Sequence, residues 1–298
     1  MISIIICSVN AKMLNNLKKN IEETIGVPYE IIATDNSIRN HGICRVYNEA
    51  GARARFSYLC FAHEDIQFET ENWGNIIAGH LSNRNIGLIG IAGGDAKSMV
   101  PSSWSIPIIS NEIHLVQHFK SADSPPKRIS ETNPHTSGNS KNVTALDGVL
   151  LCTRKEVFDQ FKFDDINLQG FHGYDIDYSL QVNTKYRVCA ISDIMLHHFS
   201  DGKPDKKWVE SAILISKKWK KSLPVSAASF SKEQYNLHHW HSFRIFIQHL
   251  FRLKYSYPII TKFYLTYSFN RFFSLRRFLS LGKYILIRDH KPHPLKGG

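Results

Sequence analysis

The sequence predicts an α/β fold, in which a mixed, mostly parallel sheet is flanked by helices and followed by a helical C-terminal appendage. Strand and helix signals alternate through the first 200 residues, and polar side chains repeatedly follow apolar strands. The last third of the chain is basic and rich in aromatic residues. With 298 residues, 43% of them hydrophobic, the chain can bury one large core and carry an appendage. We expect the two parts to be residues 1–205 and 206–298.

The first half of the chain shows the clearest alternation. Ile2 to Cys7 is a β-branched run suited to a buried strand. Leu14, Leu17 and Ile21 then recur at helical spacing until Gly26 and Pro28 end the helix. The same reasoning predicts strands at residues 2–7, 29–34, 57–62 and 86–92, and a second helix at 42–55.

The second half is less regular. Residues 95–145 are rich in Pro, Ser, Asn and Thr without clear periodicity, which predicts a lid, a binding loop or a disordered segment. Regular structure is expected again at 143–152, with a short helix from Arg154, a helix at 175–182 and a strand at 187–191. Residues 206–221 predict an amphipathic helix with Trp208 and Ile215 on its apolar stripe.

Charge is distributed unevenly along the chain. Residues 1–200 hold 18 Lys+Arg and 21 Asp+Glu, a net charge of −3, whereas residues 201–298 hold 19 and 5, a net charge of +14. Fourteen of the 35 aromatic residues lie between Trp240 and Tyr284. An acidic globule with a basic, aromatic tail suggests chemistry in the first part and adhesion to an anionic partner in the second.

The tail contains a predicted amphipathic helix with a cationic face. Its apolar positions recur at helical spacing and its polar positions lie opposite: Phe243, Phe246, Ile247, Leu250 and Phe251 against Arg244, Gln248 and Arg252. We expect residues 240–298 to attach to an anionic membrane surface. The alternative is that the aromatics pack the tail onto the first domain or a second subunit. Nucleic acid is not expected, because the sequence has no RNA-binding motif and the first domain is acidic.

The expected location is the cytoplasm, with peripheral attachment to the inner face of the membrane. The five cysteines are odd in number and show no C-x-x-C spacing, which is typical of reduced cysteines. Residues 1–15 lack the basic flank and cleavage pattern of a secretory signal, and no apolar run is long enough to span a bilayer.

Polar residues follow three of the predicted strands. They are Ser8-Val9-Asn10, Asp35-Asn36-Ser37 and His63-Glu64-Asp65. An open parallel sheet places its ligands beyond the carboxyl ends of its strands, so these residues are candidates for ligand contacts. Helix capping and turn closure are the alternative for each of them. No P-loop and no G-x-G-x-x-G occurs, which argues against a Walker-type NTPase and a standard dinucleotide fold.

Seven segments carry a resemblance to a known family. IIICSVN (4–10), EIIATDNS (30–37), YNEAGARA (47–54), YLCFAHED (58–65), LDGV (146–149), GFHGYDID (170–177) and HHFSDG (197–202) follow the order of motifs in family 2 glycosyltransferases with the GT-A fold. The sequence most resembles the streptomycin-biosynthesis-type subgroup, in which His-Glu-Asp replaces Asp-x-Asp. The resemblance covers roughly residues 1–205 and leaves the tail unmatched.

The resemblance implies transfer of a sugar from a nucleoside diphosphate to a hydroxyl acceptor, a glycan or a lipid-linked acceptor in surface polysaccharide synthesis. A divalent metal, Mn²⁺ or Mg²⁺, would stabilise the diphosphate leaving group. Asp65 is implied as its main ligand and His198 as a second, with His197 as the alternative to His198. His63 stands where most relatives hold a carboxylate, which leaves less negative charge at the metal.

The resemblance also implies roles for the other motif residues. Asp175 matches the general base of inverting relatives, although an Asp at a helix N-terminus is the alternative explanation. Asp35 would accept the imide N–H of uracil or thymine, which favours UDP- or dTDP-sugars. The implied nucleotide-sugar-binding set is Ser8, Val9, Asn10, Asp35, Ser37, Glu64 and Asp147.

Two other functions compete with this interpretation. A non-catalytic nucleotide-sugar-binding or scaffold protein would result if the His-Glu-Asp change has removed activity. A nucleotidyltransferase is disfavoured, because no glycine-rich basic loop occurs near residue 10. An oligomeric assembly is compatible with either function.

Overall fold

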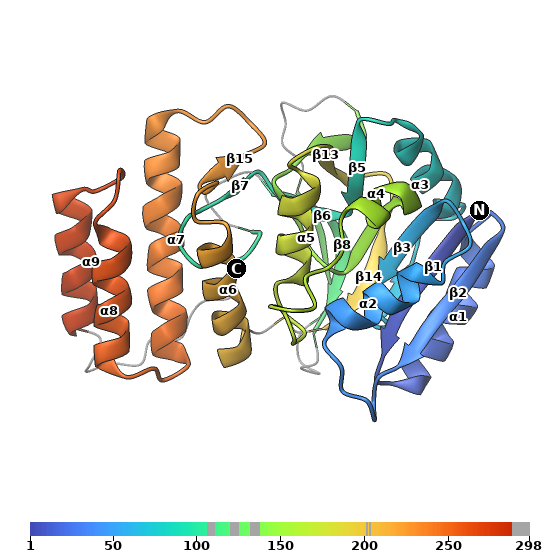
Figure 1. Cartoon of the computed structure of the whole chain (residues 1–298), viewed down its shortest axis with the longest axis horizontal. Helices are drawn as coiled ribbons and strands as arrows, with labels where there is room; N and C mark the ends of the chain where they lie inside the picture. The colour runs from blue at the N-terminus through green and yellow to red at the C-terminus, as the bar shows by residue number, and fades with distance from the viewer. Residues whose placement is uncertain (106–110, 120–124, 132–137, 201, 203, 288–298) are drawn as a thin grey trace.

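The structure is a computed structural model that describes residues 1–298 except 106–110, 120–124, 132–137, 201, 203 and 288–298. Asp201 of the last motif and the end of the predicted membrane-binding tail, residues 288–298, therefore lie outside the described residues. A region of sheets and helices is followed by a purely helical region, and α7, α8 and α9 lie side by side at the far end from the N-terminus (Figure 1). The predicted α/β fold with a helical C-terminal region is confirmed.

The main sheet has seven strands and is mixed. In spatial order they are β10 (Ser140–Asn142), β13 (Arg187–Ile191), β5 (Ile86–Gly90), β12 (Leu150–Arg154), β3 (Tyr58–Ala62), β1 (Ile2–Ser8) and β2 (Tyr29–Asp35). β1 runs parallel to β2 and β3, and β13 runs parallel to β5, while the other three pairings are antiparallel. The carboxyl ends of β1, β2 and β3 therefore meet at one edge, as the polar residues after them predict.

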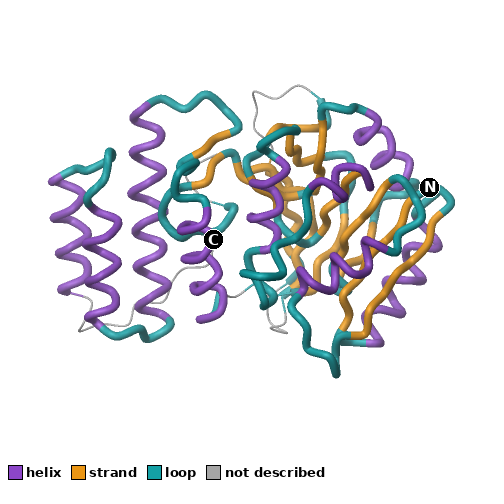
Figure 2. Tube along the Cα trace, viewed as in Figure 1, coloured by secondary structure: helices purple, strands orange, loops and turns teal. Residues whose placement is uncertain are grey.

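Helices cover both faces of this sheet (Figure 2). In β1, Ile4 and Ile6 face α1 (Ala11–Thr24) and α3 (Trp73–Ser82), whereas Ile5 faces α2 (Ile43–Ala52), α4 (Lys155–Gln160) and α5 (Tyr174–Val182). Because successive residues of a strand point to opposite faces, a strand covered on both sides must be apolar throughout. This is why the run of isoleucines in β1 identifies a central strand.

The prediction of a long irregular segment at 95–145 is wrong. Its described part contains β7 (Ala96–Lys97), β8 (Asn111–His118), β9 (Lys127–Glu131), β10 and β11 (Ala145–Leu146). β8 is the centre of a second sheet, in which the strand order is β11, β6 (Ala92–Gly94), β8, β14 (Leu196–Phe199) and β4 (Ile66–Phe68). β9 also pairs with β8. The periodicity is hidden because β8 buries polar residues: Glu112 and His114 pair with each other at 3.0 Å, between Oε1 and Nε2.

Two further predictions need correction. The expected strand 86–92 breaks at Ile91, so that β5 belongs to the main sheet and β6 (Ala92–Gly94) to the second. β4 (Ile66–Phe68), β14 (Leu196–Phe199) and α3 were not predicted at all. β4 and β14 are antiparallel neighbours, with His198 opposite Ile66. This pairing brings His198, from the last of the seven motifs, beside His63-Glu64-Asp65, across more than 130 positions of sequence.

The C-terminal region contains α6 (Lys206–Lys218), β15 (Val225–Ser226), α7 (Lys232–Arg252), α8 (Tyr257–Ser268) and α9 (Leu275–Ile287). The apolar face predicted for membrane contact is instead buried: Phe243, Phe246, Ile247 and Leu250 are each 0% exposed and form a core with α8 and α9. This face packs mainly within the tail, and Val100 and Met99 join it from the first part of the chain, so the alternative of packing onto the first domain is met only there and packing onto a second subunit stays a prediction. None of the described helices has the length and hydropathy needed to span a bilayer.

The two parts of the chain are joined by packing and by strand pairing. α6 contributes Ile215 to the core of the first region and Val209 to that of the helical region. β15 pairs with β7, and the N–H of Ala227 donates to the carbonyl of Asp95. The boundary at 205 and 206 stays a prediction, because α6 packs on both sides of it.

Candidate functional site

The ends of β1 and β3 are joined through Glu64. Its carboxylate accepts hydrogen bonds from the Ser8 hydroxyl at 2.6 Å and from the N–H groups of Val9 and Asn10 at 3.2 and 3.0 Å. All three donors belong to the turn between β1 and α1. Glu64 therefore fixes this turn against the end of β3, and its lone pairs are occupied by the chain itself.

Asn10, Asp35 and Ser37 close local structure. Asn10 caps α1, accepting from the N–H groups of Lys12 and Met13. Asp35 lies beside Ser8 in the β1–β2 register and accepts from the N–H and the hydroxyl of Ser37. These hydrogen bonds lower the pKa of Asp35, which is exposed and ionised. The turn-closing explanation accounts for Asn10 and Ser37, and the Asp35 carboxylate still faces solvent at the strand edge.

His63, Asp65 and His198 converge on one point. His63 Nδ1 and His198 Nε2 lie 3.8 and 3.7 Å from the same oxygen, Asp65 Oδ1, and all three ligand atoms lie within 4.8 Å of one another. The three side chains are between 14% and 22% exposed, so they are partly shielded and still reachable from solvent. Two imidazoles and one carboxylate at this spacing can hold a divalent metal ion.

The surrounding hydrogen bonds leave both imidazoles ready to ligate. The Tyr174 hydroxyl donates to the Gly148 carbonyl at 3.0 Å, so it accepts from His63 Nε2 at 2.7 Å. The Gln117 amide nitrogen donates to the His198 carbonyl, so the Gln117 oxygen accepts from His198 Nδ1 at 3.2 Å. This network assigns the hydrogen of each ring to the far nitrogen. The nitrogen that faces Asp65 then carries a free lone pair, as a metal ligand requires.

His197 faces away from this point. Its Nε2 lies 3.3 Å from Glu69 and its Nδ1 lies 2.8 Å from His118 Nε2. Adjacent residues of a strand point to opposite faces, so only one member of the His197-His198 pair can reach Asp65. The structure brings His198 to the site and places its alternative, His197, with Glu69 and His118.

Asp175 and Asp147 lie beside the site, next to Tyr174 and Gly148. Asp175 lies in the first turn of α5, is half-buried, and accepts from the Gly148 N–H at 3.1 Å. Burial and the neighbouring Asp147 charge raise the pKa of Asp175 to about 7. Asp147 accepts from Trp104 Nε1 at 2.6 Å and from the Val149 N–H at 2.8 Å, which keeps its carboxylate in place.

Gly148 makes this flank possible. A Cβ atom at this position would lie 2.0 Å from the Tyr174 hydroxyl, so only glycine allows Tyr174 to reach both His63 and the Gly148 carbonyl. Through its hydrogen bond to His63, Tyr174 connects the candidate metal ligands to the start of α5, where Asp175 is the next residue. Phe171, which is 54% exposed, adds an aromatic wall 5.5 Å from the His63 ring.

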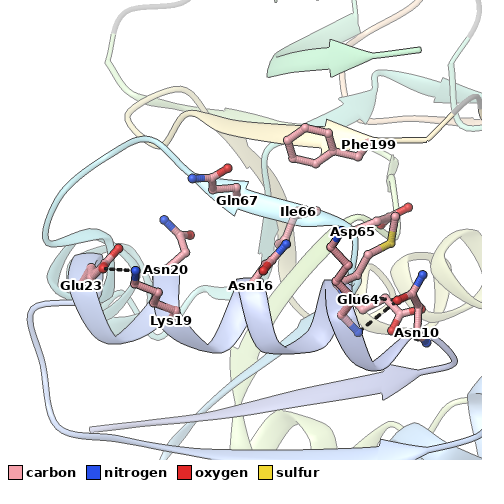
Figure 3. Close-up of a pocket in the computed structure, with 12 residues that line it drawn as sticks. Asn10, Asn16, Lys19, Asn20, Glu23, Glu64, Asp65, Ile66, Gln67 and Phe199 are labelled. Carbon is pink, nitrogen blue, oxygen red and sulfur yellow. Dashed lines mark hydrogen bonds and ion pairs between the residues drawn. The ribbon is translucent and has the colours of Figure 1, made fainter. Parts of the chain in front are cut away.

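A cavity of about 550 Å³ opens on the other side of Asp65, between α1 and β4 (Figure 3). Polar and charged side chains line it together with apolar ones: Asn10, Lys12, Met13, Asn16, Lys19, Asn20, Glu23, Glu64, Asp65, Ile66, Gln67 and Phe199. This volume is typical of a small-molecule site. Of the triad His63, Asp65 and His198, only Asp65 lines this cavity. Asp175 is connected to the triad on another side, through its neighbour Tyr174 and the Tyr174–His63 hydrogen bond. Asp35, Ser37, Asp147 and Asp175 do not line the cavity.

Sequence comparison identifies the class of protein. The chain belongs to the glycosyltransferase-like family, whose match covers residues 3–221. A comparison with curated proteins gave no match. The family assignment agrees with the resemblance read from the motifs, at the level of a glycosyltransferase.

Solved structures share the fold. A structure of GalNAc-T7 with UDP, GalNAc and Mn²⁺ aligns with a TM-score of 0.53 and 12% identity, over 99% of this chain and 59% of that chain. A structure of S. aureus TarS aligns with a TM-score of 0.51 and 11% identity, over 97% and 53%. The chain thus spans little more than half the length of either protein. At these identities the likeness shows the GT-A fold.

Sequence reasoning missed three contributors to the site. His63 is expected to stand in place of a carboxylate, yet it lies among the candidate ligands; its position two residues before Asp65 in the turn between β3 and β4 was the available signal. Tyr174 and Gln117 fix the imidazole tautomers through hydrogen bonds across 111 and 81 positions of sequence. Nothing local in the sequence points to either of these contacts.

Proposed function

We propose that the protein is a metal-assisted glycosyltransferase that moves a sugar from a nucleoside-diphosphate donor to a hydroxyl acceptor. The observation that carries the proposal is the convergence of His63, Asp65 and His198, to which Tyr174 links the neighbouring Asp175, a carboxylate whose pKa lies near neutrality. Membership of a glycosyltransferase-like family over residues 3–221 supports the same reaction class.

The residues present fit a divalent metal. Two neutral imidazoles and one carboxylate favour Mn²⁺ or a similar transition ion over Mg²⁺, which prefers all-oxygen ligation. Burial lowers the pKa of His63, which favours the neutral ring that ligation needs. When bound, such an ion supplies Lewis-acid stabilisation of the charge that develops on a diphosphate leaving group. The Mn²⁺ bound in GalNAc-T7 supports this choice of ion.

Asp175 is proposed as the general base of an inverting reaction. Its carboxylate would take the proton of the acceptor hydroxyl as that oxygen attacks the sugar, a role worth on the order of 10²–10⁴-fold. A pKa of about 7 matches this task near neutral pH. The Gly148 N–H holds one oxygen of Asp175 in place, and burial, with the Asp147 charge as a smaller cause, keeps the pKa of Asp175 raised.

We place the donor on the Asp65 side of the triad and the acceptor on the Asp175 side. Leaving group and base must lie on opposite sides of the sugar in an inverting transfer. The cavity along α1 is large enough for part of a nucleotide sugar, and Lys12 supplies a cation there, whereas Lys19 is paired with Glu23 at 3.8 Å. Asp35, exposed at the same sheet edge, is proposed to accept the imide N–H of uracil or thymine, which favours UDP- or dTDP-sugars.

The acceptor is proposed to be a glycan or a lipid-linked glycan in surface polysaccharide synthesis, and the transferred sugar a hexose. The protein is proposed to belong to the streptomycin-biosynthesis-type subgroup, because His-Glu-Asp replaces Asp-x-Asp at residues 63–65. A cytoplasmic location at the inner face of the membrane fits such an acceptor. Ser8, Val9 and Glu64 are proposed to shape the donor pocket through the turn that they fix.

A donor panel tests the proposal. Thermal unfolding is measured with UDP-, dTDP- and GDP-sugars, with and without Mn²⁺, and release of the nucleoside diphosphate is followed in the same samples with glycan acceptors or water. We expect Mn²⁺-dependent stabilisation by UDP- or dTDP-sugars together with turnover. Stabilisation without turnover on any acceptor would instead identify a nucleotide-sugar-binding protein, and no stabilisation by any donor would contradict both functions.

A further inference from the structure

A second cavity, of about 240 Å³, lies between α7 and α9, in the helical region rather than at the strand-edge site. Arg244, His241 and Trp240 of α7 face Arg277 and Tyr284 of α9 across it, and Leu237 lines its rim. No carboxylate belongs to its lining among the described residues. The family match ends at residue 221, so this cavity belongs to a part of the chain that the family does not describe.

The two arginines of this cavity are held in place without a counter-charge. Arg277 Nη1 donates to the Asn236 carbonyl at 3.0 Å, and the Arg244 guanidinium lies 5.2 Å from the centre of the Tyr284 ring. Neither forms an ion pair within the described part of the chain, and the sequence has no Asp or Glu from residue 234 to 288. Burial and the nearby Arg244 lower the pKa of His241, so this ring is neutral and adds hydrogen-bonding capacity to the two cations.

The solvent-facing surface of α9 is apolar and basic, and its row of leucines lies on the side of the helix away from the cavity-lining Arg277 and Tyr284. Leu275, Leu279 and Leu286 are 61%, 59% and 69% exposed, and their spacing places them on one face of the helix. Arg276 and Lys283, seven positions apart, form an exposed row next to the cavity-lining residues. The turn between α8 and α9 exposes Phe269 by 62% and Phe273 by 44%.

We propose that the cavity between α7 and α9 binds the phosphate group of an anionic membrane lipid, while the exposed face of α9 and the α8–α9 turn enter the bilayer interface. Paired guanidinium groups match phosphate oxygens in geometry and charge. Exposed leucine and phenylalanine residues gain free energy by leaving water for the interfacial region. This combination of cations and apolar groups, with no acidic residue, fits an anionic lipid surface better than a protein partner or free phosphate.

The inference goes beyond the proposed function and uses other residues. It also replaces the membrane-binding face expected from the sequence: the face of α7 that contains Phe243 is buried, whereas Arg244 of that helix lines the cavity. Donor binding at the strand edge does not depend on it, so failure of either proposal leaves the other intact.

Co-sedimentation of the full chain with vesicles tests the inference. Vesicles of phosphatidylcholine alone are compared with vesicles that also contain phosphatidylglycerol. The cavity variant is R244Q/R277Q, and the matched control is K217Q/K220Q, which removes the same charge from exposed positions on or just after α6. We expect binding to the phosphatidylglycerol vesicles only, a fall of about 30-fold in the cavity variant and less than about 3-fold in the control.

Two soluble probes separate lipid from free phosphate. Short-chain monomeric phosphatidylglycerol and inorganic phosphate are titrated against the wild-type chain, R244Q/R277Q and L279S/L286S. We expect the short-chain lipid to bind the wild-type chain and L279S/L286S but not R244Q/R277Q, and L279S/L286S to lose vesicle binding. Equal losses in the cavity variant and the lysine control would reduce the effect to overall charge and overturn the cavity site. Tight binding of inorganic phosphate without vesicle binding, or no binding of any probe, would overturn the lipid assignment.

Discussion

Polar side chains have different surroundings in the strand-edge site and in the helical region. At the strand edge, Glu64, His63, His198 and Asp147 each have hydrogen-bond partners within the chain, which fix their positions before a ligand arrives. In the helical region, Arg244 and Arg277 line a cavity whose described lining contains no acidic residue. Leucine and phenylalanine side chains of α9 and of the α8–α9 turn are exposed to water. The comparison teaches that the first region is preorganised for chemistry, whereas the second is a surface that a partner must complete.

Replacing Asp65 should have the largest effect on the preorganised side. Asp65→Ala removes the only carboxylate of the triad, and we expect turnover to fall by about 10³-fold or more while the chain stays folded. The rise in Tm on adding Mn²⁺ should disappear. Asp165→Ala, at an exposed position, is the matched control and should behave as wild type. An unchanged rate in Asp65→Ala would remove the metal role.

Asp175→Asn should lower kcat by about 10²–10⁴-fold and leave the affinity for the donor nearly unchanged, because the amide keeps the shape of the side chain but cannot take a proton. In the wild-type chain, kcat/KM should rise with pH through about 7, as Asp175 becomes ionised. A collapse of donor affinity in Asp175→Asn would make Asp175 a binding residue rather than the base.

The same residue links activity to stability. The pKa of Asp175 is raised in the folded chain, so the folded state holds its proton more tightly than the unfolded state does. This contribution to stability is complete below the ordinary pKa of an aspartate and is lost as pH rises through about 7. Thermal unfolding should show that the Tm advantage of Asp175→Asn over wild type grows between about pH 5 and 8. A constant difference over that range would argue against a raised pKa.

Tyr174→Phe should weaken Mn²⁺ binding by about 10- to 100-fold, because the His63 ring loses the acceptor that fixes its tautomer. Calorimetric titration of Mn²⁺ measures this positioning role directly. Tyr178→Phe, which removes another buried hydroxyl from α5, is the control and should retain Mn²⁺ affinity. Equal losses in the two variants would point to general destabilisation of α5.

The smallest expected effect is a shift in a pH profile. Asp147→Asn keeps an oxygen for Trp104 and removes the charge that helps to raise the pKa of Asp175. The acidic limb of the kcat/KM profile should therefore move to lower pH, by less than one unit, since burial is the larger cause of the raised pKa. A shift to higher pH would show that Asp147 acts on Asp175 in another way.

Much of the fold follows from local pattern. The predicted bounds of β1, β2 and β3 lie within a residue or two of the observed ones, because each is an apolar run that ends in polar residues; β1 and β3 are buried, whereas β2 is a half-buried edge strand. β8 was missed because its polar residues Glu112 and His114 satisfy each other inside the second sheet. β4 is three residues long, too short for any periodicity to appear. α3 was not predicted, although its buried residues Trp73, Ile77 and Leu81 recur every four residues, which is helical spacing.

The sequence by itself determined the three strands that end in polar residues, the family motifs, and the division of charge between the two regions. Tertiary structure alone decided which histidine meets Asp65, since strand pairing of β14 with β4 and β8 sets which face each side chain takes. It also decided which face of the tail is exposed, because α7 can bury its aromatic stripe only where α8 and α9 supply a matching surface. Such contacts join residues that are far apart in the chain, so they cannot be predicted from the local sequence.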